Sequence, residues 1–180
     1  TIKTNLTGTI NMLGVARKNN ACILQASTSE VYGNPEIHPQ SESYVGSVNP
    51  IGPRACYDEG KRLGETLCYI YHEYFGVHAN IIRPFNVYGP GQSLSNPYTG
   101  ILSIFSTQIR NGNGIQVFED GKESRDFVYI DDVVTATILG IEKEEANGQV
   151  FNVGSGIAVD VLTVAKTLIN AYHIDVPITI

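Results

Sequence analysis

Two short apolar runs, each preceded by a segment with helical spacing, constrain this chain most. Apolar residues recur at helical intervals over residues 4–19, directly before the first run at residues 21–26. Residues 57–75 contain no proline and end at Gly76, in the position of a helix C-cap, before the second run at residues 77–82. This order of helix, strand, loop, helix and strand predicts an α/β fold with a doubly wound parallel sheet. In such sheets, ligands bind beyond the carboxyl ends of the strands.

The pattern changes after Gly91, where the expected elements become shorter. We divide the chain into residues 1–90, which carry the sheet, and residues 91–180, a smaller lobe interleaved with the sheet. In the lobe we expect helices at residues 102–109, 133–142 and 161–172, short strands at residues 116–118 and 150–153, and no closing element at residues 176–180.

Composition excludes several classes of function. The net charge is −6 and no run of basic residues is longer than Lys61-Arg62, so we expect neither a nucleic-acid partner nor a membrane surface. Three cysteines without C-x-x-C spacing indicate reduced thiols and a cytoplasmic protein. The four histidines show no ligand spacing, so no metal site is expected. No apolar run is long enough to span a bilayer, and no leader opens the chain.

The spacing Tyr57-x-x-x-Lys61 places a phenol and an ammonium on one face of the second expected helix. The ammonium can then lower the pKa of the phenol. The loop after the first strand adds the Thr28 hydroxyl and the Glu30 carboxylate. These four groups together can oxidise a sugar alcohol. The alternative is that Tyr57 packs its ring while Lys61 points to solvent.

Five ordered motifs resemble those of the extended short-chain dehydrogenases/reductases that modify nucleotide sugars with NAD: the epimerases, 4,6-dehydratases and decarboxylases. Among these, the second motif is most similar to UDP-glucuronate decarboxylases. The motifs are ASTSEVYG at residues 26–33, GPRACYDEGKR at 52–62, RPFNVYGP at 83–90, SRDFVYIDD at 124–132 and FNVG at 151–154.

The resemblance implies part of a Rossmann-like NAD(P)-binding domain and part of a small C-terminal substrate-binding lobe. The Gly-rich dinucleotide fingerprint of the family is not among these 180 residues. The pairs Gly89-x-Gly91, Gly112-x-Gly114 and Gly154-x-Gly156 lack its third glycine, so we interpret them as turns. The chain therefore resembles the middle and part of the C-terminal region of a longer enzyme.

The resemblance also implies roles for individual residues around the cofactor. Tyr57 is the base that takes the proton of the sugar C4 hydroxyl, and Thr28 donates a hydrogen bond to the same oxygen. Lys61 holds the ribose hydroxyls of NAD as well as the phenolate. Pro84 lies along the nicotinamide, and Asn5 lies near it, although an Asn near a helix start can equally be a cap.

For the substrate, the resemblance assigns the diphosphate to two residues. Arg125 is the bidentate clamp, because a planar guanidinium matches paired phosphate oxygens. The alternative is a salt bridge to Asp126 or Asp131. Asn86, just after a strand, can donate to the same diphosphate.

Two further expectations come from the family. Val117 and Phe118 resemble the segment that lines the nucleotide base, with simple core packing as the alternative. The helices at residues 4–19 and 57–75 form a homodimer interface in the family, which suits the exposed aromatics expected on the second helix.

Glu30 discriminates between reactions, because simple 4-epimerisation needs no extra carboxylate. Ser29 stands where dTDP-glucose dehydratases usually have Asp, and Thr-Ser-Glu occurs in UDP-glucuronate decarboxylases and GDP-mannose 4,6-dehydratases. We expect decarboxylation of UDP-glucuronate through a 4-keto sugar, with 4-epimerisation or 4,6-dehydration as alternatives. An alternative from another class is an inactive remnant that only dimerises or binds a nucleotide sugar.

Overall fold

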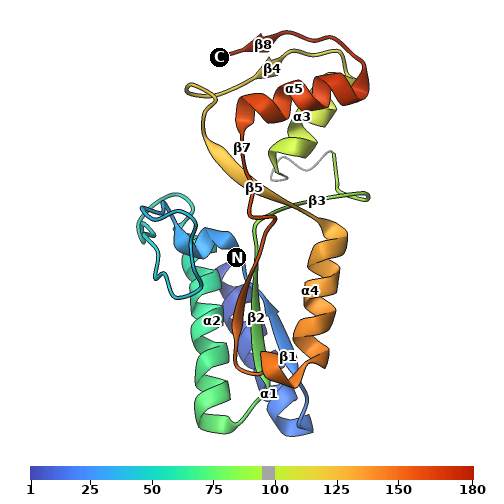
Figure 1. The fold of residues 1–180 in the computed structure, drawn as a ribbon. Coiled ribbons are helices and arrows are strands. Elements are labelled where there is room, and N and C mark those ends of the chain that lie inside the picture. The colour runs from blue at the N-terminus through green and yellow to red at the C-terminus, as the bar shows by residue number, and fades with distance from the viewer. Residues whose placement is uncertain (95–99) are drawn as a thin grey trace. The chain divides into compact units, whose positions relative to one another are not determined.

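The computed structural model describes residues 1–94 and 100–180 (Figure 1). The chain forms two compact units and passes between them more than once. The first unit comprises Thr1–Phe85 and Asp131–Val153, and the second comprises Asn86–Ile130 and Gly154–Ile180. The first of these passages lies near the division expected at residue 90, but Asp131–Val153, which we expected in the lobe, belong to the first unit.

The first unit is built on a parallel sheet with the strand order β1-β2-β6. β1 (Ile23–Ala26) pairs with β2 (Ala79–Pro84), which pairs in turn with β6 (Val150–Val153). The central strand β2 is buried along its whole length except at Pro84. The predicted parallel α/β sheet is therefore confirmed, and β2 runs through its centre.

Helices cover both faces of this sheet (Figure 1). The π-helix η1 (Thr4–Gly8) continues into α1 (Thr9–Asn19), which packs with α2 (Ala55–Phe75) over one face. α4 (Ile130–Glu142) covers the other face.

The alternation of side chains along β2 explains this arrangement. Ala79 and Ile81 join a core with Leu13 of α1 and Cys68 of α2. Asn80 points the opposite way and donates to the carbonyl of Gly140 in α4. At Gly140, a Cβ atom would lie 2.7 Å from Leu24 Cδ1, so α4 packs closely on β1 at this position and a larger residue would require Leu24 to shift.

The described residues of the second unit form two small sheets and two helices. β5 (Ser124–Tyr129) lies between β3 (Asn86–Tyr88), to which it is parallel, and β7 (Ala158–Asp160), to which it is antiparallel. α3 (Ile101–Arg110) and α5 (Val161–Tyr172) share one apolar core that includes Phe105, Ile109, Val164 and Ala165.

Element boundaries differ from the expected ones where hydrogen bonds, rather than apolar pattern, decide them. We expected no closing element at residues 176–180. This expectation is wrong, because β8 (Ile178–Thr179) pairs in parallel with β4 (Ile115–Gln116). That pairing also places β4 earlier than the strand expected at residues 116–118. The short 3-10 helices η2 (Ser29–Tyr32) and η3 (Glu144–Ala146) have no apolar periodicity to predict them.

Two predictions about glycines are confirmed. Gly76 caps α2 in a left-handed conformation, with its N–H bonded to the carbonyl of His72. None of the three Gly-x-Gly pairs opens a helix directly: α3 begins only at Ile101, ten residues after Gly91, and the other two pairs are followed by strands, so none has the context of a dinucleotide loop. Within the two described ranges, no helix combines the length and apolar character that crossing a membrane requires.

A buried ion pair joins α2 to the sheet of the first unit. Arg83, near the end of β2, donates from Nε to Glu65 Oε1 at 2.9 Å and from Nη2 to Glu65 Oε2 at 2.6 Å. Both side chains are nearly buried, with 11% and 13% of their surface exposed. Ser27 donates to the same Glu65 carboxylate, and Tyr32 accepts from Arg83 Nη1. The pair therefore holds the carboxyl ends of both β1 and β2 against α2.

We expect Glu65→Gln to lower the free energy of unfolding by about 3 kcal/mol, because it leaves the Arg83 guanidinium buried without its counter-ion. Urea unfolding followed by circular dichroism measures the difference. Glu73→Gln, at an exposed position of the same helix, is the matched control and should change the value by less than about 0.5 kcal/mol. Equal stability of the two variants would contradict the importance of the pair.

Asp58, in the first turn of α2, is buried, and its Oδ1 atom has no hydrogen-bond partner among the described residues. Burial raises the pKa of this carboxyl, Arg54 opposes the rise and Glu59 adds to it. Because the folded-state pKa lies above the unfolded one, ionised Asp58 destabilises the fold above its folded pKa and not below its unfolded pKa.

Asp58→Asn removes this penalty. We therefore expect the stability difference between the variant and the parent to favour the variant more at pH 7 than at pH 4. Urea unfolding at both pH values measures it. A difference that is independent of pH would show that the burial of Asp58 carries no electrostatic cost.

Candidate functional site

Thr28 and Glu30 lie in a turn that follows directly on β1. Thr28 is extended, with φ −165° and ψ 154°, and is the N-cap of η2. Its Oγ1 accepts a hydrogen bond of 3.2 Å from the backbone N–H of Glu30. This cap fixes the hydroxyl and the carboxylate of the motif in one short turn at the carboxyl end of the strand.

Tyr57 and Lys61 occupy neighbouring turns of α2, as the sequence predicts. Lys61 Nζ lies 5.9 Å from the centre of the Tyr57 ring and donates to the carbonyl oxygen of Ala26 at 2.8 Å. Burial lowers the pKa of the Lys61 ammonium below its usual value. Since Ala26 ends β1 two residues before Thr28, this hydrogen bond holds Lys61 beside the turn that carries Thr28. The alternative in which Lys61 simply points to solvent is wrong.

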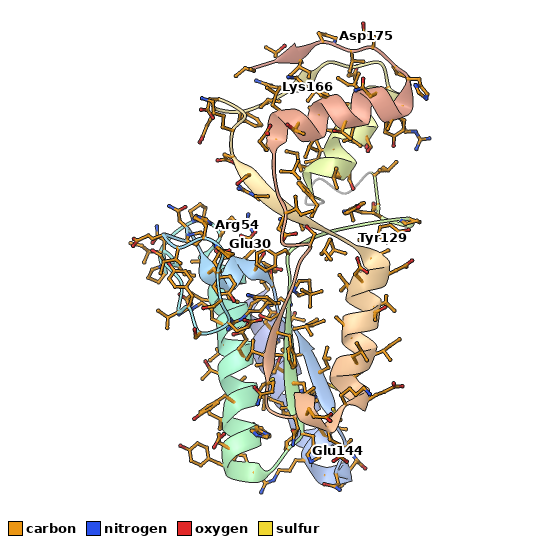
Figure 2. The ribbon with its side chains drawn as sticks, in the orientation of Figure 1. Glu30, Arg54, Tyr129, Glu144, Lys166 and Asp175 are labelled. Carbon is orange, nitrogen blue, oxygen red and sulfur yellow. The ribbon has the colours of Figure 1, made fainter. Side chains whose placement is uncertain are left out.

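Arg54, which sequence reasoning did not single out, contacts a residue of the candidate site. Its Nη2 atom lies 2.9 Å from Glu30 Oε2, and Figure 2 shows the two labelled side chains meeting. Arg54 is the N-cap residue of α2, and Tyr57 follows it by three residues. No spacing in the sequence signals this pair, because a loop separates the two residues. The Glu30 carboxylate is thus held by an ion pair.

Asn5 and Pro84, the other expected cofactor residues, also belong to the first unit. Asn5 lies inside η1, whose N-cap is Lys3, so it is not the helix cap that one interpretation expected. Its Nδ2 atom is buried and has no partner among the described residues. At Gly60, a Cβ atom would lie 2.9 Å from this nitrogen, so Asn5 reaches α2 next to Lys61. Pro84 ends β2, in register with Val153 of β6.

The expected diphosphate residues lie in the second unit. Arg125 Nη2 pairs with Glu123 Oε2 at 3.1 Å, and both side chains are about half exposed. The expected alternative of a salt bridge to Asp126 or Asp131 is wrong. Asn86 Nδ2 donates to the backbone oxygen of Asp126 at 2.9 Å, which joins β3 to β5 beside Arg125.

Asp126 is occupied by a neighbouring loop, which explains why Arg125 does not pair with it. Its carboxylate accepts from the backbone N–H groups of Ser155 and Gly156 at 2.7 and 2.9 Å. A Cβ atom at Gly154 would lie 2.5 Å from Asp126 Oδ2, so the close approach needs glycine. The Arg125 guanidinium is consequently left at the surface of the unit.

Val117 and Phe118 have different environments. Val117 is buried in the core between α3 and α5, as the packing alternative expected. Phe118 is 76% exposed. Of the two side chains, only that of Phe118 is therefore accessible to a ligand.

A cavity of about 520 Å³ in the first unit lies on another side of α2. Arg62, Thr66 and Tyr69 of α2 line it, together with Tyr44 of the preceding loop. None of Thr28, Glu30, Tyr57 or Lys61 lines it. In the described ranges, no group of three or more His, Cys, Asp or Glu side chains is placed to hold a metal ion.

Comparison with known proteins places these features in a family. The sequence model described as "NAD dependent epimerase/dehydratase family" matches residues 1–154. UDP-glucuronic acid decarboxylase 1 of Xenopus tropicalis is 49% identical over 138 residues, which cover 77% of this chain and 32% of that protein. UDP-glucuronic acid decarboxylase 3 of Arabidopsis thaliana is 45% identical over 171 residues, 94% of this chain and 49% of that protein.

Solved structures agree with the fold. UDP-glucuronic acid 4-epimerase from Bacillus cereus, in complex with UDP-glucuronic acid and NAD, superposes with a TM-score of 0.83 at 27% identity. The match covers 99% of this chain and 54% of that one. The chain thus spans half or less of the length of the curated relatives described above. Its fold, its motifs and the match over residues 1–154 show that the chain belongs to the NAD-dependent epimerase/dehydratase family.

Proposed function

We propose that the chain is part of an NAD-dependent enzyme that decarboxylates UDP-glucuronate through a 4-keto sugar. One observation carries the proposal: Lys61 is bonded to the end of β1, so the Tyr57 helix meets the turn that holds Thr28 and Glu30. The two UDP-glucuronic acid decarboxylases described above support the choice of reaction.

The first unit offers donors that fit the nicotinamide end of NAD. Asn5 Nδ2 is a buried donor without a partner among the described residues. The Lys61 ammonium has more N–H groups than its bond to Ala26 uses. The carboxamide and ribose oxygens of NAD are acceptors of the kind these donors need, and Pro84 ends the neighbouring strand. When bound, NAD takes a hydride from the sugar and later returns it.

Oxidation at C4 needs only three of the residues in the first unit. Tyr57 accepts the proton of the C4 hydroxyl while the C4 hydrogen departs as hydride, which leaves a ketone at C4. The positive charge of Lys61 stabilises the phenolate. Thr28 donates a hydrogen bond to the same sugar oxygen.

Loss of the carboxylate follows from the position of that ketone. The C6 carboxyl of a 4-keto-glucuronate is β to the ketone, so the C5–C6 bond breaks with release of carbon dioxide and its electrons pass into an enolate of C4 and C5. A proton then returns to C5, hydride returns to C4, and Tyr57 gives its proton back to the oxygen. We assign Glu30 to this second stage, because oxidation alone does not require it.

For the diphosphate and the base of a nucleotide we propose residues of the second unit. Arg125 and Asn86 are the proposed diphosphate ligands, and Phe118 is the proposed wall of the base subsite, whereas Val117 packs in the core. The half-exposed guanidinium of Arg125, with Glu123 as its partner in the free protein, supports the first assignment, and the exposed ring of Phe118 supports the second.

The substrate is tested by incubating the complete protein and NAD with UDP-glucuronate, UDP-glucose, GDP-mannose and dTDP-glucose. We expect carbon dioxide and a UDP-pentose from UDP-glucuronate, identified by mass spectrometry and NMR. An unchanged mass with inverted C4 would instead identify a 4-epimerase, and loss of water a 4,6-dehydratase. Either result would refute decarboxylation.

Tyr57→Phe provides the matched variant for this assay. It removes the phenolic oxygen that takes the C4 proton, so we expect turnover to fall by a factor of about 1,000. Tyr74→Phe, at an exposed position of the same helix, should retain turnover within about twofold. Full activity of Tyr57→Phe would refute its role as the base.

We further propose that the protein is a cytoplasmic homodimer joined through η1, α1 and α2. The cytoplasmic location is supported by three cysteines that are all free thiols. The dimer is supported by apolar side chains exposed on both helices. They are Ile10, Met12, Val15, Leu63, Tyr69, Tyr74 and Phe75.

Val15→Glu should convert the dimer of the complete protein to a monomer, because it buries an unpaired charge in the interface. Light scattering after gel filtration measures the mass. Ile51→Glu, at an exposed apolar position outside both helices, should leave the dimer intact. A monomeric parent protein, or a dimeric Val15→Glu variant, would contradict the proposed interface.

A further inference from the structure

The ion pair between Arg54 and Glu30 has no role in oxidation at C4, yet it lies beside the residues proposed for that step. The Nη2 to Oε2 distance is 2.9 Å. Glu30 lies two residues after Thr28, and its backbone N–H donates to the Thr28 hydroxyl. Arg54 precedes Tyr57 by three residues. In Figure 2 the two side chains meet at the start of α2.

Arg54, Tyr57 and Lys61 follow one another at intervals of three and four residues. This spacing places them on a single stripe of the helix surface, with the phenol between two cations. A sugar whose C4 hydroxyl reaches Tyr57 carries its C6 group only two bonds farther on. A C6 carboxylate therefore comes close to the pair formed by Arg54 and Glu30.

Glu30 alone would repel such a substrate. Two like charges at short range oppose each other, and their juxtaposition is one means by which a site rejects a ligand. A neutral hexose would meet no repulsion. A site that contains Glu30 can therefore accept a sugar acid only if a cation compensates both carboxylates.

We propose that Arg54 determines the specificity of this site for a sugar acid, by sharing its guanidinium between Glu30 and the C6 carboxylate of the substrate. The guanidinium has a planar fork of five N–H donors, so it can bind two carboxylates at once. Arg54 is 64% exposed and Glu30 40% exposed, so both remain accessible to a substrate. The inference rests on the proposed function, because it names the group that recognises the acid.

The test compares binding of UDP-glucuronate with binding of UDP-glucose, which differ only at C6, where the first has a carboxylate and the second a neutral hydroxymethyl group. Dissociation constants are measured by calorimetry on the complete protein with NAD, in a Tyr57→Phe background that leaves the sugars unreacted. We expect Arg54→Gln to raise the dissociation constant of UDP-glucuronate by about tenfold or more and that of UDP-glucose by less than about twofold. Adding Glu30→Gln to Arg54→Gln should restore most of the lost affinity, because it removes the uncompensated charge.

Lys18→Gln is the matched control for the loss of one positive charge. Lys18 lies in the last turn of α1, before β1 begins, whereas Glu30 follows the other end of that strand. This variant should leave both affinities unchanged. Unfolding midpoints of all variants are measured in parallel, and the exposed pair should leave them unaltered.

The inference would be overturned if Arg54→Gln weakened the binding of both sugars equally. It would also be overturned if adding Glu30→Gln restored none of the lost affinity for UDP-glucuronate. The proposed function fails separately, in the product assay, if the active protein releases no carbon dioxide from UDP-glucuronate. The ratio of the two affinities is independent of that assay, so the two failures are distinguishable.

Discussion

The buried ion pair between Glu65 and Arg83 is the interaction on which the candidate site depends. Glu65 lies one turn beyond Lys61 on α2, and Arg83 directly precedes Pro84 at the end of β2. Ser27, which donates to the same carboxylate, directly precedes Thr28. Three segments that carry expected site residues are therefore joined at one carboxylate. Because the pair is nearly buried, it is only weakly screened, and small displacements of α2 would break several hydrogen bonds together.

Much of the first unit could be predicted from the sequence, because its signals are local. Apolar runs predicted β1 and β2, helical spacing predicted α1 and α2, and Gly76 marked the end of α2. The interactions that hold these elements together could not be predicted, because their partners are distant in the chain. Glu65 and Arg83 come from different elements, and Arg54 meets Glu30 only after the intervening loop has folded back. Charged residues on a helix give no sign of which distant strand they will meet.

The second unit shows the limit of pattern reasoning more clearly. β4 and β8 are each two residues long, too short for any periodicity, and they exist because their backbone groups pair with each other. The alternative considered for Arg125 was a salt bridge to Asp126 or Asp131, but the Asp126 carboxylate accepts hydrogen bonds from the loop at Ser155 and Gly156 instead. That loop lies far from Asp126 in the chain, and nothing in the SRDF motif indicates that the two will meet. The sequence shows that Arg125 carries a positive charge, but only the tertiary structure determines its ion-pair partner.

We propose that Tyr57, Lys61, Thr28 and Glu30 convert a sugar acid through a transient ketone at C4. UDP-glucuronate with deuterium at C4 tests it most directly, when supplied with NAD to the complete protein and analysed by mass spectrometry and NMR. The account predicts a UDP-pentose that has lost C6 and retains deuterium at C4, because the hydride removed in the first step returns in the last. A product that keeps all its sugar carbons, or a pentose without deuterium at C4, would contradict it.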